Sequence, residues 1–106
     1  MSAVALVYTL FGSAEAAERV ARQLLDEGLI ACANMFAPAT SLYEWNGAVE
    51  RAQEVPVLFK TAGARRGALM DRLAQLHDYD VPAILAVPVD AVLPDFGQWV
   101  ADRTTK

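Results

Sequence analysis

Apolar and polar positions follow two different periodicities along the chain. Short, nearly continuous apolar runs occupy residues 3–10 and 83–89, a pattern typical of strands buried on both faces. Elsewhere, apolar residues recur three or four positions apart, which is the spacing of an amphipathic helix. The pattern therefore predicts strands interspersed with helices.

The first helix is predicted between Ser13 and Gly28. A serine can accept a backbone hydrogen bond as the N-cap, and a glycine commonly follows the last turn in a left-handed conformation. The apolar stripe between them consists of Ala17, Val20, Ala21, Leu24 and Leu25.

A long hairpin is predicted around Asn46-Gly47, because a type I′ turn needs positive φ at both central positions. Its first strand covers residues 30–36 and, after an interruption at Pro38, residues 40–45. The return strand covers residues 49–61. Its outer half is polar and its inner half apolar, which predicts a tip that projects beyond the core.

Prolines mark the remaining boundaries. Pro56 cannot donate a ladder hydrogen bond, which predicts a bulge or an edge position within the return strand. A second helix is predicted over residues 64–77, and Val81-Pro82 prevents its continuation. Pro94 suits the first position of a last short helix that reaches Arg103.

The predicted order is β-α-β-β-α-β followed by a terminal helix. This order defines an α+β, ferredoxin-like split βαβ sandwich, built as one domain over residues 1–106. Both helices would cover the same face of the sheet, which leaves the other face bare in a monomer. The hairpin over residues 39–53 and the terminal helix are the segments expected to cover it across subunits.

Composition gives an independent reason to expect association. Of the 106 residues, 55% are apolar and the mean hydropathy is +0.24, whereas roughly 45–50% is usual even with glycine counted. Small domains bury a smaller share of their surface than large ones. The apolar excess therefore predicts a surface buried against another chain.

Charge and targeting signals exclude several partners. The net charge of −4 argues against nucleic acid, whose phosphates require a basic face. No run approaches the ~20 apolar residues of a membrane span. The first six residues lack the basic segment of a signal peptide, and the single Cys32 cannot form an intrachain disulfide. Both observations favour the cytoplasm.

Several segments in order resemble one family, the CutA divalent-cation tolerance proteins. The resemblance rests on residues 28–34 (GLIACAN), 41–47 (SLYEWNG), 77–82 (HDYDVP) and 87–89 (VPV), together with Glu54-Val55, Lys60-Thr61 and Trp99. It implies a tight homotrimer, like the PII-type signalling trimers, in which sheets face inward and hairpins wrap neighbours. It also implies a role in metal tolerance, with copper bound in some members, and no enzymatic reaction.

Three residues are candidate metal ligands, for copper or another divalent cation. Cys32 offers a soft thiolate that suits Cu(I), although a small buried strand residue is the simpler interpretation. His77 either interacts with the carbonyls at a helix end or lines a cleft between subunits with Tyr79 and Asp80. One chain supplies too few ligands for a closed Cys/His site. Tyr8 and Leu76 stand where some family members have cysteine and histidine.

Three further residues are candidates for a ligand cleft. Trp45 near the hairpin tip either stacks on a ligand or anchors a subunit interface. Lys60 either holds an anion or pairs with Glu54 or Asp80. With Tyr79, these residues suggest an alternative function, a PII-like trimer that senses a small molecule in intersubunit clefts.

Other functions on this fold fit less well. An acylphosphatase-like hydrolase needs an arginine in the loop after the first strand, and residues 10–13 contain none. No Ser/His/Asp order and no Gly-rich phosphate loop is present, so neither catalysis nor an organic cofactor is expected. An RNA-recognition sheet needs basic residues beside aromatics, and the first strand offers only Tyr8. A purely structural trimer is a further alternative.

Overall fold

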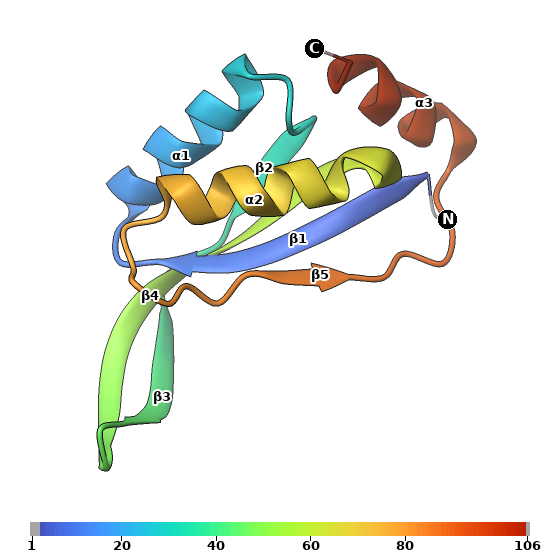
Figure 1. Ribbon diagram of the computed structural model, residues 1–106. Helices are drawn as coiled ribbons and strands as arrows, with labels where there is room; N and C mark the ends of the chain where they lie inside the picture. The colour runs from blue at the N-terminus through green and yellow to red at the C-terminus, as the bar shows by residue number, and fades with distance from the viewer. Residues whose placement is uncertain (1–2, 106) are drawn as a thin grey trace.

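Two helices cover one face of an antiparallel sheet in the computed structural model, which describes residues 3–105. Helices α1 (Ala14–Asp26) and α2 (Arg66–Leu76) form this layer, and α3 (Pro94–Arg103) packs at the end of the sheet where the first strand begins (Figure 1). Met1, Ser2 and Lys106 lie outside the described residues. Met1 and Ser2 belong to the N-terminal segment in which no signal peptide is expected. Within residues 3–105, no helix is both long and apolar enough for a membrane span.

The sheet has the strand order β2-β4-β1-β5, and β3 extends it beyond one end. Its strands are β1 (Val4–Phe11), β2 (Cys32–Met35), β3 (Ala39–Trp45), β4 (Ala48–Ala62) and β5 (Leu85–Val87). The inner half of β4 lies between β1 and β2, and its outer half pairs with β3 alone. The ferredoxin-like prediction is confirmed, with the strand interrupted at Pro38 observed as β2 and β3.

Local signals set the ends of α1. The Ser13 hydroxyl accepts a hydrogen bond from the Ala16 N–H at 3.1 Å, as an N-cap does. At the other end Gly28 has φ 70°, and the Leu29 N–H donates to the Leu24 carbonyl at 3.0 Å. This is a Schellman motif, in which a glycine takes the left-handed position without the penalty of a Cβ.

The β3–β4 hairpin projects away from the body of the molecule (Figure 1). Asn46 and Gly47 have φ 52° and 81°, as the predicted type I′ turn requires. Val49 near the tip is 77% exposed. The principal extents of 46 × 27 × 23 Å reflect this arm.

The two faces of the sheet differ in burial. The face toward α1 and α2 is closed: it carries Val7, Thr9 and Phe11 of β1 and the odd-numbered residues from Val55 to Thr61 of β4. The opposite face, here called the open face, carries half-buried apolar side chains. They are Leu6, Tyr8 and Leu10 of β1 and Leu58 of β4. Burial of β1 on both faces is therefore only partly achieved within one protomer.

One end of the open face is covered by α3. Val100 packs with Val4 and Ala31, and the Phe96 ring lies 5.8 Å from the Lys60 Nζ. The terminal helix thus shields only the start of β1, and most of the open face keeps its access to solvent.

The prediction of a buried strand over residues 83–89 is wrong for a single protomer. Only Leu85–Val87 form a strand, and β5 is an edge strand in which Leu85 is 55% and Val87 41% exposed. An apolar run does not reveal whether the residues that cover it belong to the same chain.

The prediction of a bulge or edge position at Pro56 is confirmed on the side of β4 that faces β2 and β3. Met35 pairs with Val57 and Ala39 with Glu54, so residues 36–38 lie opposite only two residues of β4, which is one extra residue as in a β-bulge. Pro56 lies on the inner strand β4, and the β1–β4 register passes through the Leu10–Pro56 pair without an extra residue. The Pro56 carbonyl accepts the Phe36 N–H at 2.9 Å, so the missing N–H points to the side where β2 has just ended. No ladder hydrogen bond to β1 is lost.

Candidate functional site

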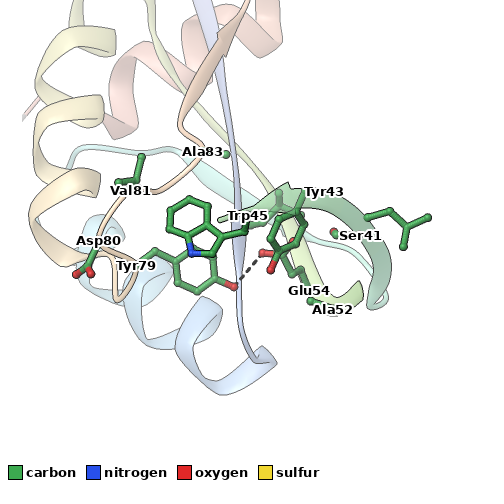
Figure 2. A pocket seen from close by; sticks show the side chains of 11 residues that line it. Ser41, Tyr43, Trp45, Ala52, Glu54, Tyr79, Asp80, Val81 and Ala83 are labelled. Atoms are coloured by element: carbon green, nitrogen blue, oxygen red, sulfur yellow. Dashed lines mark hydrogen bonds between the residues drawn. The ribbon is translucent and has the colours of Figure 1, made fainter. Parts of the chain in front are cut away.

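An open groove of about 710 Å³ lies between the hairpin and the segment that joins α2 to β5. Figure 2 shows the side chains that line it. Tyr43 and Trp45 come from β3, Glu54 from β4, and Tyr79 from the joining segment. The other lining residues are Leu10, Ser41, Leu42, Ala52, Asp80, Val81 and Ala83.

Strand alternation places these side chains on one wall. Successive side chains of a strand point to opposite faces, so Ser41, Tyr43 and Trp45 share one face of β3. The β3–β4 register pairs Ala39 with Glu54 on this same face. Because Glu54 has the parity of Leu58 in β4, the groove continues the open face of the sheet into the hairpin.

A hydrogen bond between Tyr79 and Glu54 joins the two walls of the groove. The Tyr79 hydroxyl donates to the Glu54 carboxylate over 2.9 Å (Figure 2). Burial, and then this bond to a carboxylate, raises the pKa of Tyr79 to about 12. The phenol therefore stays protonated at neutral pH and holds the joining segment against the base of the hairpin.

His77 holds the segment that joins α2 to β5 from the side of the covered sheet face. It follows the last residue of α2, and its own N–H closes the helix by donating to the Leu73 carbonyl at 3.0 Å. Its ring is stacked on Phe11, with centroids 4.6 Å apart and planes 8° from parallel. Only 9% of the residue is exposed.

Both ring nitrogens of His77 are engaged. Nε2 lies 2.8 Å from the Leu10 carbonyl oxygen, and Nδ1 lies 3.1 Å from the Tyr79 backbone nitrogen. A carbonyl only accepts and a backbone N–H only donates, so this pair of contacts assigns the tautomer with the proton on Nε2. His77 thus positions Tyr79 and has no free lone pair for a metal.

The charged side chains that line the groove are negative. Glu54 and Asp80 line it, and the lining residues found within positions 3–105 include no lysine, arginine or histidine. Outside the groove, Asp78 forms an exposed ion pair with Arg19 at 3.4 Å. The groove therefore combines aromatic faces with negative charge.

Lys60 and Cys32 lie away from the groove. They are paired across β4 and β2, on the open face near α3. Lys60 does not form the predicted ion pair with Glu54 or Asp80, because six residues of β4 separate it from Glu54, about 20 Å in an extended strand. It lies over the Phe96 ring instead.

The predicted metal ligands are not brought together in one protomer. Cys32 aligns through Lys60 with Leu6, whereas His77 contacts Leu10, about 13 Å further along β1. Burial raises the pKa of the half-buried Cys32 thiol, although the nearby Lys60 acts to lower it. Asp80 is exposed at the groove. No group of three candidate ligands occurs in the part of the chain that the structure describes, so the residues do not fit a metal site within one subunit.

Two partners were not predicted from the sequence: Glu54 as the acceptor for the Tyr79 hydroxyl and the Leu10 carbonyl as the partner of His77. The alternation of β4 does carry a signal, because Val55, Val57 and Phe59 mark the covered face and leave Glu54 on the other. The segment that contacts Glu54 is determined by the pairing of β1 with β4, and these two strands lie far apart in the sequence.

Fold and groove together define a ferredoxin-like α+β domain with a long hairpin arm. The chain belongs to the CutA1 divalent ion tolerance protein family, whose model matches residues 5–103. A divalent-cation tolerance protein CutA of Pyrococcus horikoshii is 42% identical over 101 residues, which are 95% of this chain and 98% of that protein. The resemblance noted from the sequence motifs is thereby confirmed.

Solved structures agree with this assignment. The divalent ion tolerance protein CutA1 of Ehrlichia chaffeensis superposes with a TM-score of 0.95 at 33% identity, over 100% of this chain and 99% of that one. A periplasmic divalent cation tolerance protein CutA of Archaeoglobus fulgidus gives a TM-score of 0.91 at 33% identity, over 95% of this chain and 98% of that one.

Proposed function

We propose that this chain acts in divalent-cation tolerance as a homotrimer that binds the cation between subunits, without catalysis. The observation that carries the proposal is the open face, on which apolar side chains of β1 and β4 are only half-buried and those of β5 are exposed, and of which α3 covers one end. The edge strand β5 and the projecting hairpin border this face.

The accessible surface supports association. It measures 6483 Å², compared with about 5800 Å² for a typical monomer of 11.5 kDa. Exposed large apolar side chains on the hairpin and on β5 account for part of the excess, and contiguous patches of this kind mark interaction sites. Neighbouring copies of the hairpin are the proposed cover.

Among the candidate ligands, Asp80 is the one that is exposed and lines the groove. His77 uses both ring nitrogens within its own subunit, and Cys32 lies in a different part of the sheet. A cation such as copper would therefore be bound by Asp80 together with groups from adjacent subunits. His77 acts as the residue that positions the segment carrying Asp80.

Isothermal titration with Cu(II), Cu(I) and Zn(II) tests this arrangement on the wild type, Asp80→Asn and Asp71→Asn. Asp71 is an exposed residue of α2 outside the groove and serves as the matched charge control. The proposal expects stoichiometric binding that Asp80→Asn weakens and Asp71→Asn leaves intact. Equal binding by all three proteins would exclude Asp80 from the site.

The groove supports a second candidate function, a PII-like trimer that senses a small molecule. Its volume lies within the range of ligand pockets, roughly 300–1,000 Å³, and it joins an apolar floor to a few polar groups. A thermal-shift screen of nucleotides, carboxylates and amines tests this function, since a ligand that binds only the folded state raises Tm. A flat screen would count against it.

The cytoplasmic location stays a proposal as well, since the related Archaeoglobus fulgidus protein is described as periplasmic. Fractionation of expressing cells, with markers for both compartments, tests it. Recovery with the periplasmic marker would contradict the proposal.

A further inference from the structure

We propose that the groove binds a small organic cation, in which an ammonium group lies against the aromatic side chains and beside the carboxylates. This inference rests on the ligand-sensing alternative above and names the chemical class of the ligand.

The aromatic side chains supply the first element of such a site. Tyr43, Trp45 and Tyr79 enter the groove from two different segments of the chain (Figure 2). The face of an aromatic ring is negative and attracts a cation within about 6 Å of its centroid, with tryptophan the strongest of these rings. Trp45 is 56% exposed in a single protomer, so no element of its own subunit closes its ring off from a ligand.

The charge of the lining supplies the second element. Glu54 and Asp80 are the charged residues of the described lining. The Tyr79 hydroxyl, which donates to Glu54 at 2.9 Å, fixes one carboxylate oxygen and leaves the other free to accept from an ammonium group. An anionic nucleotide or carboxylate would face two like charges here without a compensating lysine or arginine.

The apolar floor discriminates between an organic and an inorganic cation. Divalent ions such as Ca²⁺ and Mg²⁺ require six or more oxygen ligands, and Zn²⁺ in proteins requires four ligands at short distance. The groove instead is lined by Leu10, Val81 and Ala83 as well as by its few polar groups. These side chains would contact the carbon substituents of an alkylammonium ion, which an inorganic ion lacks.

A fluorescence titration of the full chain tests the inference. The chain has two tryptophans, so Trp99→Phe on α3 leaves Trp45 as the single reporter. The probes are choline, its neutral isostere 3,3-dimethylbutan-1-ol, and the anion glutarate. We expect choline to bind at least tenfold more tightly than the neutral isostere, and glutarate to give no response.

Two matched variants locate the binding. Glu54→Gln retains an acceptor for the Tyr79 hydroxyl but removes the charge, and is expected to weaken choline binding at least fivefold. Glu44→Gln removes the same charge from the opposite face of the same hairpin, since Glu44 pairs with Val49 and not with a groove residue. It is expected to change choline binding less than twofold.

Each contrary result has a separate meaning. Equal binding of choline and the neutral isostere, or binding of glutarate alone, would overturn the organic-cation inference and leave the ligand-sensing function standing. An equal effect of Glu54→Gln and Glu44→Gln would place the binding outside the groove and overturn the inference. No response to any probe, as expected if a neighbouring subunit fills the groove, would overturn both the inference and the ligand-sensing function.

Discussion

The Tyr79 hydroxyl donates a 2.9 Å hydrogen bond to the Glu54 carboxylate and so ties the segment after α2 to the base of the projecting hairpin. His77 supports the same segment by accepting the Tyr79 N–H at 3.1 Å. Two contacts to one residue thus connect the helical layer, the sheet and the hairpin arm.

Removal of the Tyr79 hydroxyl is expected to cost about 1 kcal/mol of folding stability, the usual net value of one hydrogen bond. The folded pKa of about 12 lies above the reference value of 10.0, so the folded state holds the proton more tightly. This contribution is complete below pH 10 and is lost as the pH rises toward 12. Denaturation of wild type and Tyr79→Phe at a fixed protein concentration should give a stability difference that shrinks over this window. A difference independent of pH would contradict the assignment.

Replacement of His77 by phenylalanine is expected to destabilise the fold by about 3 kcal/mol. The Leu10 carbonyl and the Tyr79 N–H would both lose their partner, and each buried unpaired group costs roughly 1–3 kcal/mol. Stacking on Phe11 would survive, so the loss reports the hydrogen bonds. Chemical denaturation measures the loss, and His77→Gln, which can still donate and accept, should lose less. A fully stable His77→Phe would show that His77 does not hold the segment.

Arg72 and Glu27 join α2 to the C-terminal end of α1 through two parallel hydrogen bonds of 2.8 Å. The hydrogen bonds from Arg72, and then the one from Gln23, lower the pKa of Glu27 from 4.5 to about 2. A depressed carboxyl pKa contributes stability above pH 4.5, and this contribution is lost as the pH falls toward 2. The stability advantage of wild type over Arg72→Met should therefore disappear across this acid window. An advantage that persists at pH 2 would contradict the pairing.

Thr9 is fully buried, and its hydroxyl has no hydrogen-bond partner among residues 3–105. Thr9→Val should therefore be neutral or stabilise the fold by roughly 1 kcal/mol, because a buried unpaired polar group is removed at nearly constant volume. Thr104 is the matched control, since its buried hydroxyl donates to the Val100 carbonyl at 2.9 Å. Thr104→Val should destabilise. The reverse order of the two Tm values would refute this interpretation.

Local chemistry made much of the fold predictable from sequence. Ser13 and Gly28 bound α1 because capping depends on residues a few positions apart, and Asn46-Gly47 sets its own turn. The exposure of Leu85 depends on which strands are neighbours, which no local pattern contains.

The candidate site was predictable in some of its residues but not in their roles. Trp45, Tyr79 and Asp80 do line one groove. Lys60 and Cys32 share a row of the sheet far from it, because the register pairs Lys60, near the inner end of β4, with Cys32 of β2. His77 was recognised as a candidate ligand, and only its long-range contact with Leu10 reveals a positioning role.

The molar mass in solution tests the central claim most directly. Light scattering of the full chain at micromolar concentration should give a value near three times 11.5 kDa, because copies of the chain cover the open face. A stable species of 11.5 kDa, with the open face exposed to water, would contradict the account.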